Sequence, residues 1–267
     1  MASTNDFYGK WALVTGASAG IGVALARELA RNGAKLILTA RRKDRLDALA
    51  QELRATGVEV RTIAADLEDT AAPQQLYDAT EGTGIAVDIL IDNAGLGQFG
   101  EFHTNPVDQE LRQVRVNCEA VVRVARMFVP RMVERKRGWV LITASTASFQ
   151  PLPLSATYAA TKVFDRFFAL ALAQEVARYG VNVTALCPGL TESEFFDVAR
   201  AQAFRRTGTV QSAEEVARIG LAALAAGRRT VIPHTSGRWM ARMVRFLPTG
   251  LVTGMVDKAL RRSLPPA

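Results

Sequence analysis

Three side chains that can move a proton at a carbonyl group lie close together in the sequence. Tyr158 and Lys162 are four residues apart in the segment YAATK, and Ser145 precedes the tyrosine by thirteen residues. If residues 156–179 form a helix, the tyrosine and the lysine share one face, one turn apart. A neighbouring ammonium group lowers the pKa of a tyrosine from its usual value of about 10. With a hydroxyl to hold the substrate oxygen, the set predicts carbonyl–alcohol interconversion, provided that a hydride donor binds nearby.

Each of these residues also has a plain structural interpretation. Tyr158 and Lys162 fit an exposed pair on a helix, and Ser145 is one of several loop hydroxyls, with Ser148 and Ser155 as neighbours. A binding site for a hydride donor elsewhere in the chain would favour the catalytic interpretation.

Strand-like and helix-like stretches alternate along the chain. Almost continuous apolar runs predict buried strands, and apolar residues three and four apart predict helices between them. The predicted strands are 10–15, 35–40, 58–64, 89–92, 139–143, 181–187 and 230–232, and the predicted helices are 20–32, 43–55, 70–80, 107–116, 117–135, 156–179 and 212–226. This order predicts an α/β fold: a doubly wound, Rossmann-like parallel sheet of about seven strands with helices on both faces. Binding sites are expected at the carboxyl ends of its strands.

The length and composition fit one domain. The chain has 267 residues, of which 49% are hydrophobic and 22% are charged, as is ordinary for globular proteins. We expect a single domain over residues 1–267, with a core of about 8–232 and a tail of 233–267. Cys118 and Cys187 lack metal-ligand spacing, so we expect no metal site and a reducing compartment. No secretory signal or membrane-spanning apolar run is seen, so we expect a cytoplasmic protein.

The net charge of +7 belongs to the C-terminal tail. Residues 228–267 hold eight basic side chains and only one acidic side chain, so the rest of the chain is balanced. A nucleic-acid-binding protein would spread basic residues over a binding face and carry a known motif, so no nucleic-acid partner is expected.

Part of this tail, residues 238–247, has the spacing of an amphipathic helix. Its apolar side holds Trp239, Met240, Met243, Val244 and Leu247, and its other side holds Arg238, Arg242 and Arg245. A second helical stretch, 249–262, follows Pro248. We favour packing over the chain's own pocket or against a second subunit. Peripheral contact with the inner face of a membrane and a merely solvated face stay open as alternatives.

A glycine-rich turn follows the first predicted strand. In TGASAGIG, residues 15–22, three glycines (16, 20 and 22) separate a strand from a helix. Backbone N–H groups in such a turn can approach a pyrophosphate at the positive end of the helix. The spacing is not the common G-x-G-x-x-G pattern, and a tight strand-to-helix turn is the structural alternative. The surrounding alternation of strands and helices favours a dinucleotide.

The end of the second predicted strand indicates which dinucleotide binds. Cofactors without a 2′-phosphate need an acidic residue about 20 positions after the glycines, which accepts from the ribose hydroxyls. This chain has TARR at residues 39–42, with no acidic residue. Arg41 and Arg42 can bind a 2′-phosphate through charge-assisted hydrogen bonds, although Arg42 also fits a solvated start of the next helix. The sequence therefore predicts NADP(H) rather than NAD(H).

Taken together, these motifs resemble the compact group of the short-chain dehydrogenase/reductase family, over about residues 8–232. The glycine loop resembles the family's TGxxxGxG, residues 93–95 its NAG element, residues 158–162 its YxxxK pair and residues 188–191 its PG motif with a threonine. The resemblance implies that the cofactor is bound by Gly16, Ser18, Gly20, Ile21, Gly22, Arg41, Arg42, Asp66, Asn93, Ala94, Gly95, Tyr158, Lys162, Pro188, Gly189 and Thr191.

The resemblance also implies catalytic roles. Tyr158 would donate a proton to the carbonyl oxygen or remove one from the alcohol, and Ser145 would hydrogen-bond that oxygen. Lys162 would lower the tyrosine pKa and bind the nicotinamide ribose. Asn117, in a helix whose backbone is distorted in the family, would hold a water that connects Lys162 to solvent. Taken alone, Asn117 also fits a helix N-cap.

The sequence thus predicts an NADPH-dependent oxidoreductase for a small-molecule carbonyl or alcohol. Positions after the fourth, fifth and sixth strands are mostly apolar: Leu96, Phe99, Phe102, Ala147, Phe149, Leu152, Leu190, Phe195, Phe196 and Phe204. They favour an apolar ketone, aldehyde or acyl-type substrate, although they could instead pack a lid formed by residues 190–210. The family associates through two long helices, here 107–135 and 156–179, so a homodimer or homotetramer is expected. An NADP(H)-binding regulatory or scaffold protein is the alternative, which intact Ser145, Tyr158 and Lys162 disfavour.

Overall fold

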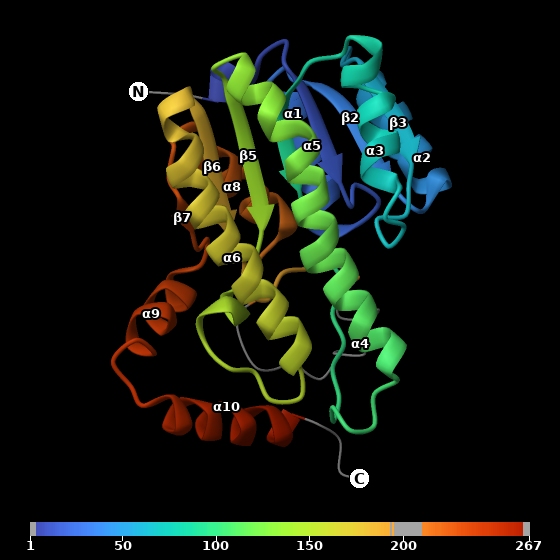
Figure 1. Cartoon of the computed structure of the whole chain (residues 1–267). Helices are drawn as coiled ribbons and strands as arrows, with labels where there is room; N and C mark the ends of the chain where they lie inside the picture. Colours follow the sequence, from blue (N-terminus) through green and yellow to red (C-terminus); the bar gives the residue numbers. More distant parts are fainter. Residues whose placement is uncertain (1–3, 193, 195–209, 264–267) are drawn as a thin grey trace.

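The computed structural model describes residues 4–192, 194 and 210–263, and one parallel sheet runs through the middle of this part of the chain (Figure 1). Its strands are β1 (Trp11–Thr15), β2 (Lys35–Ala40), β3 (Val60–Ala64), β4 (Val87–Asp92), β5 (Gly138–Thr143), β6 (Val181–Leu186) and β7 (Thr230–Val231). They pair in the order β3-β2-β1-β4-β5-β6-β7. The order reverses direction at β1 and β4, so the predicted doubly wound parallel sheet is confirmed.

Helices cover both faces of this sheet. On one face lie α1 (Gly20–Arg31), α2 (Lys43–Arg54) and α8 (Ala213–Ala225), and on the other lie α3 (Ala72–Asp78), α5 (Ala120–Glu134) and α6 (Ala156–Val176) (Figure 1). Successive strand residues point to opposite faces, as Val14 and Leu13 of β1 show by packing in different clusters. Both clusters consist of buried apolar side chains, which explains why the strands are apolar along most of their length.

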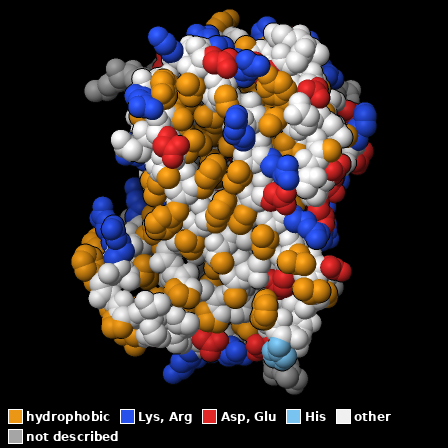
Figure 2. All heavy atoms as spheres, in the orientation of Figure 1, with side chains coloured by type: hydrophobic (Ala, Val, Ile, Leu, Met, Phe, Trp, Pro, Cys, Tyr) orange, Lys and Arg blue, Asp and Glu red, His pale blue; other side chains and the backbone are white. Residues whose placement is uncertain are grey.

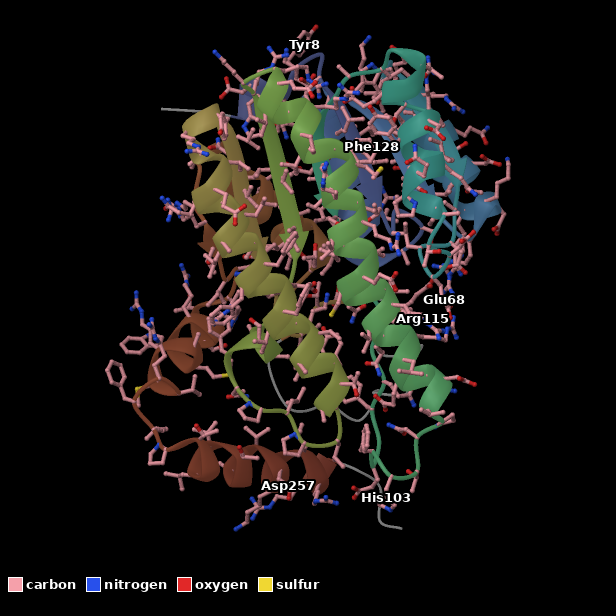
Figure 3. All side chains as sticks on the ribbon, viewed as in Figure 1. Tyr8, Glu68, His103, Arg115, Phe128 and Asp257 are labelled. Carbon is pink, nitrogen blue, oxygen red and sulfur yellow. The ribbon has the colours of Figure 1, made fainter. Side chains whose placement is uncertain are left out.

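Phe128 packs between α5 and α3, two of the helices that cover one face of the sheet. It is fully buried on α5 and points away from solvent toward α3 (Figure 3). Its ring lies 6.0 Å from the ring of Tyr77 on α3, centroid to centroid. The phenol of Tyr77 in turn accepts a hydrogen bond from Arg131 of α5 at 2.8 Å. This contact holds α3 against α5 on the face of the sheet that α6 also covers.

Residues 107–135 form one continuous helical run rather than two separate helices. The run consists of α4 (Val107–Val114), a π-helical segment (Arg115–Glu119) and α5. A π-helical segment widens the backbone hydrogen-bond pattern, and such segments are frequent at functional sites. Asn117 lies in this segment, so it is not a helix N-cap, and the distortion expected from the family resemblance is present.

The tail forms α9 (Thr235–Met243) and α10 (Thr249–Ser263), and α10 crosses the lower end of the molecule (Figure 1). Arg261 fastens it, because its guanidinium bonds Asp257 at 2.9 Å and reaches Glu101 of the loop before α4 at 2.6 Å. Asp257 and His103 of that loop lie at the same end (Figure 3). The basic helical tail predicted from the sequence is therefore present.

The apolar side predicted for residues 238–247 packs only in part against the rest of the chain. Trp239 is 62% exposed and Met243 is 53% exposed, whereas Ala241 is buried and Met240 lines a cavity of the same chain. Packing over the chain's own pocket is therefore found for Met240, but not for Trp239 or Met243. The helix ends at Met243, so Leu247 lies outside it. Instead, the second tail helix supplies the buried apolar contacts, through Val252 and Leu260.

In the described part of the chain, no helix is both long and apolar enough to cross a membrane. The segment 190–210, expected to be irregular or mobile, lies largely outside the described residues, as do Phe195, Phe196 and Phe204.

Candidate active site

One cavity of about 550 Å³ lies at the carboxyl ends of the strands, where the topology predicted a site. Of the predicted site residues, it is lined by Gly16, Ser18, Gly20, Ile21, Arg41, Arg42, Asp66, Asn93, Ala94, Gly95, Ser145, Tyr158, Lys162, Pro188, Gly189 and Thr191. Gly22 and Asn117 lie behind this lining and do not contribute to it. The cavity therefore brings together residues from six loops that are far apart in the sequence.

Two glycines of the loop, Gly16 and Gly22, stand where a side chain would not fit, and such a turn suits the close approach of a pyrophosphate. Gly16 has a φ of +66°, and a Cβ on Gly22 would lie 2.2 Å from the carbonyl oxygen of Gly16. The loop therefore packs directly on the first turn of α1, whose N-cap, Ala19, offers no side-chain acceptor. The N–H groups of that turn are left for an anion, which the helix dipole favours.

An anion-binding cluster lies beside this loop. Arg42 donates to Oε2 of Glu194 at 2.9 Å, and Arg45 pairs with the same carboxylate. Arg42 also donates to the hydroxyl of Ser18 at 3.2 Å. The bonds from Arg45 and Arg42 hold the pKa of Glu194 below its usual value. The two guanidinium groups and the Ser18 hydroxyl therefore already hold one anionic group, the Glu194 carboxylate, at this end of the cavity.

Arg41 and Asp66, the other two predicted adenosine-end contacts, face each other across the cavity mouth. The closest approach between their charged groups is 4.0 Å, and both side chains are about half exposed. Asp66 also accepts from the backbone N–H of Glu68 at 3.0 Å. This carboxylate is thereby fixed at the end of the cavity where an adenine ring would lie.

Tyr158 and Lys162 lie on one face of α6, as their spacing predicted. The ammonium nitrogen of Lys162 is 6.0 Å from the centre of the Tyr158 ring. Ser145 caps the 3₁₀ helix Thr146–Phe149, and its Oγ accepts from the backbone N–H of Ala147 at 3.1 Å. This cap fixes the hydroxyl beside the phenol, so the predicted Ser–Tyr–Lys set is assembled in space.

The pKa of Tyr158 differs from the expectation raised by the sequence. Burial raises the pKa of the phenol, and this effect exceeds the lowering by the charge of Lys162 and by the hydroxyl of Ser145. The negative charge of Asp165 raises it further. In this state of the protein, Tyr158 therefore holds its proton near neutral pH and is a proton donor.

Asn93 and Asn117 hold the surrounding loops in place. The amide of Asn93 donates to the carbonyl oxygen of Thr15 at 3.1 Å and accepts from Thr143 at 3.2 Å, so it ties β4 to the strands on either side. Asn117 is fully buried and bonds both backbone groups of Leu96 at 2.8 Å. The side chain of Asn117 is therefore occupied, and a water in a proton relay would have to bond its backbone instead.

The far end of the cavity is apolar, as the predicted substrate positions suggested. Leu96, Phe99, Ala147, Leu152 and Leu190 line it, whereas Phe102 is exposed and Phe149 stacks under Arg166 instead. Met240, from the predicted apolar side of the tail, reaches the same end, and so does Leu260, which sequence reasoning missed. Leu260 packs in one cluster with Phe99, Leu152 and Leu190. The tail therefore completes the substrate end through α10.

Asp92 and Asp165, two buried carboxyl groups behind the cavity, were also missed. The carboxylate of Asp165 lies 2.8 Å from the ammonium of Lys162. Asp92 accepts from the hydroxyl of Thr15 at 3.3 Å, and its second oxygen has no hydrogen-bond partner within the described residues. The spacing of three between Lys162 and Asp165 on a helix was a usable signal, since it predicts contact.

Comparisons with known proteins agree with this geometry. A family model described as short chain dehydrogenase matches residues 10–203. A glycine betaine reductase from Emericella nidulans is 38% identical over 208 residues, which are 77% of this chain and 16% of that protein. A very-long-chain 3-oxoacyl-CoA reductase from Homo sapiens is 35% identical over 187 residues, which are 67% of this chain and 59% of that protein. The chain thus spans less than two thirds of the length of both relatives.

Solved structures show the same architecture. A short-chain dehydrogenase from Sphingobium yanoikuyae in complex with NADPH superposes with a TM-score of 0.80 and 31% sequence identity. The match covers 93% of this chain and 95% of that one. Other similar structures hold NADP or NAD. The region matched by the family model, residues 10–203, includes the glycine loop and the Ser–Tyr–Lys set.

The buried carboxyl of Asp92 generates a prediction about stability and pH. Burial, and then the charge of Asp165, raise the pKa of Asp92 to about 8. The folded protein thus keeps a proton that the unfolded chain loses above pH ~4, so stability falls as pH rises from there to about 8. Asp92→Asn cannot ionise and should raise Tm, by a margin that grows from pH 5 to pH 8. Over this range, the free energy of unfolding of Asp92→Asn exceeds that of wild type by an amount that grows by about 1.4 kcal/mol per pH unit at most.

Thermal unfolding of both proteins across this pH range measures the effect. Asp88→Asn is the matched control, because Asp88 is buried on the same strand but is paired with Arg137 at 3.1 Å. Its Tm change should not grow in the stabilising direction with pH. A constant Tm difference between wild type and Asp92→Asn would contradict the assignment.

Proposed function

The chain belongs to the short-chain dehydrogenase family, and from this premise we propose that it is an NADP(H)-dependent oxidoreductase that interconverts a carbonyl and an alcohol. The observation that carries the proposal is the continuous cavity, which runs from the arginine cluster past the glycine loop to Tyr158 and Lys162. A cavity of this kind suits a dinucleotide laid across the strand ends with its reactive ring beside the phenol.

The chain's own residues would handle the proton and the substrate oxygen. When bound, the reduced cofactor supplies the hydride that adds to the carbonyl carbon. Tyr158 donates its proton to the carbonyl oxygen, so the product is the alcohol. In the reverse reaction, the alcohol gives up the same proton to Tyr158 and the same hydride. Ser145 holds the same oxygen from its capped position, and Lys162 stabilises the phenolate that remains.

Tyr158→Phe should abolish reduction and keep cofactor binding, because phenylalanine preserves the ring but has no proton to give. We expect kcat to fall by about 10³-fold or more, within the range of a lost acid–base catalyst plus lost orientation of the substrate. NADPH oxidation at 340 nm with a panel of ketones measures turnover, and quenching of protein fluorescence measures binding. Tyr8→Phe, at an exposed tyrosine, is the control and should behave as wild type. Substantial turnover by Tyr158→Phe would refute its role as the acid.

The preference for NADP(H) is supported by the anion-binding cluster of Arg42, Arg45 and Ser18. Glu194 now holds the place that a 2′-phosphate would take between the two guanidinium groups. NAD(H) has no phosphate to exchange for this carboxylate. An NADP(H) preference therefore follows from the replacement of one bound anion by another.

Two substitutions test this preference in opposite directions. Arg42→Ala should lower kcat/KM with NADPH by about 10–100-fold and leave kcat/KM with NADH nearly unchanged, because a charge-assisted pair contributes about 1.5–3 kcal/mol. Glu194→Gln should lower the KM for NADPH, since it removes the competing charge. Arg31→Ala, at an exposed arginine on α1, is the control. Equal efficiency of the wild-type protein with both cofactors would reject the proposal.

The substrate proposed is an apolar ketone, aldehyde or acyl-type carbonyl compound. The support is the apolar far end of the cavity, where Phe99, Leu152, Leu190 and Leu260 form one cluster. The human relative is named as a very-long-chain 3-oxoacyl-CoA reductase, a reaction of the same carbonyl class.

Leu260→Gln tests whether α10 contributes to substrate binding. Loss of this buried side chain should raise KM for a long-chain ketone by about 10-fold, as expected for about 1.4 kcal/mol of apolar contact, and affect a short ketone much less. Leu251→Gln is the matched control on the same helix, because Leu251 is 54% exposed. Equal effects of both variants on the long-chain ketone would show that α10 does not bind it.

A second copy of the chain is the proposed protein partner. Apolar side chains gather over α5 and α6 in the middle of one face (Figure 2). The exposed ones on α4, α5 and α6 are Val107, Leu111, Val114, Val122, Phe164 and Phe167. An apolar face of this extent is typical of a subunit interface, so we propose a homodimer or homotetramer through these helices. Membrane contact by the tail stays a prediction, for which Trp239 and Met243 are the exposed apolar residues.

A further inference from the structure

The ammonium group of Lys162 is held between two acceptors on the protein side of the cavity. It donates to the carbonyl oxygen of Thr143 at 2.8 Å and to Oδ2 of Asp165 at 2.8 Å. An ammonium group has three hydrogens in a fixed tetrahedral arrangement. With two of them bonded, the third is fixed in direction, and Lys162 lines the cavity into which it can point.

Burying the carboxylate of Asp165 costs free energy of folding. Its side chain is 1% exposed, that of Lys162 is 6% exposed, and the second oxygen of Asp165 has no hydrogen-bond partner within the described residues. A buried charge without its partner is strongly destabilising, so each of the two groups depends on the other. A carboxylate placed here for stability alone would be expected to satisfy both oxygens.

Several titratable groups face this pair from the surrounding elements. Tyr158 lies on the same helix, Cys118 on the π-helical segment, Asp92 at the end of β4 and Cys187 after β6. Burial raises the pKa of Cys118 to about 11 and that of Cys187 to about 12, so both thiols are neutral at pH 7. Asp92 also keeps its proton there. Asp165 is thus the acidic group in direct contact with the Lys162 ammonium, at 2.8 Å.

We propose that Asp165 is a positioning residue for this reaction: its carboxylate keeps Lys162 charged inside the protein and turns the free ammonium hydrogen toward the cavity. The proposal rests on the proposed function, because it gives Lys162 its task beside Tyr158. The ligand group that this hydrogen would meet is a hydroxyl of the cofactor's ribose or the phenol itself.

The charge balance around Lys162 determines what loss of Asp165 would do. Burial pulls the pKa of Lys162 down, and the charge and hydrogen bond of Asp165, with a smaller contribution from Tyr158, raise it above its usual value. Burial raises the pKa of Asp165 as well, and Lys162 opposes that rise. Without the carboxylate, burial dominates, and Lys162 loses its proton at a lower pH. The alkaline limb of the activity profile then moves to lower pH.

The experiment is a pH profile of kcat/KM for NADPH-dependent reduction by Asp165→Asn and wild type. We expect the alkaline limb to move down by about one pH unit or more, and KM for NADPH to rise by about 10-fold. Asp88→Asn is the matched control, because it also removes a buried carboxylate that is paired with a basic residue, at a site away from the cavity. The alkaline limb of the Asp88→Asn profile should stay at the wild-type pH. A folded Asp165→Asn protein with the wild-type limb and KM overturns the proposal.

A measurement on the wild-type protein covers the case in which Asp165→Asn does not fold. Competitive acetylation of the amines over a pH series gives the pKa of each lysine, independently of its accessibility. The pKa of Lys162 should lie at or above the usual value for a lysine side chain. A clearly lower value would overturn the proposal. The labelling needs no turnover, so its outcome is separate from that of the substrate screen: absence of reductase activity would reject the proposed function alone.

Discussion

The structure depends on holding one ammonium group, that of Lys162, out of water. Removing a charge from water costs several kcal/mol, which only close and well-directed partners can offset. Here one partner is a backbone carbonyl at the end of β5 and the other is a carboxylate one turn away on α6. The strand and the helix must therefore meet in one register, and the π-helical segment packs against that helix. The catalytic geometry is thus a consequence of how a buried charge is accommodated.

The parallel sheet makes this accommodation feasible. All strands that flank the site end at the same edge, so their loops converge on one cavity without long excursions. Glycine is required where two of these loops touch, because the β1–α1 turn packs directly on α1 and on the loop after β4. The same crowding leaves backbone N–H groups, rather than side chains, at the surface of the cavity. In the proposed function, a nucleotide would be recognised at its phosphates by the fold itself and at its 2′-position by side chains.

The fold and the chemical set could be predicted because their signals are local. The strands are continuous apolar runs, and the spacing of Tyr158 and Lys162 on a helix follows from helix geometry alone. Interactions between distant segments could not be predicted in this way. Glu194 reaches Arg42 across 152 residues, and Leu260 reaches the substrate end from the last helix. Trp239 and Met243 were misjudged for a related reason: an amphipathic pattern shows that a helix has two sides, but not how much of its apolar side the rest of the chain covers.

Asp165 lies between the features that local sequence signals predict and those that only the folded chain shows. Its spacing from Lys162 is local and was readable, but the importance of the contact depends on burial, which one segment cannot reveal. On an exposed helix the same pair would contribute only about 0.3–0.5 kcal/mol and would have no bearing on chemistry. Inside the protein it opposes the effect of Lys162 on Tyr158, because the carboxylate cancels part of the charge that would stabilise a phenolate. Burial is still the largest reason why the pKa of Tyr158 is raised, so the carboxylate adjusts the phenol rather than determining its protonation alone. The charge pair therefore links two effects at one site: it retains a buried ammonium group and moderates that group's influence on Tyr158.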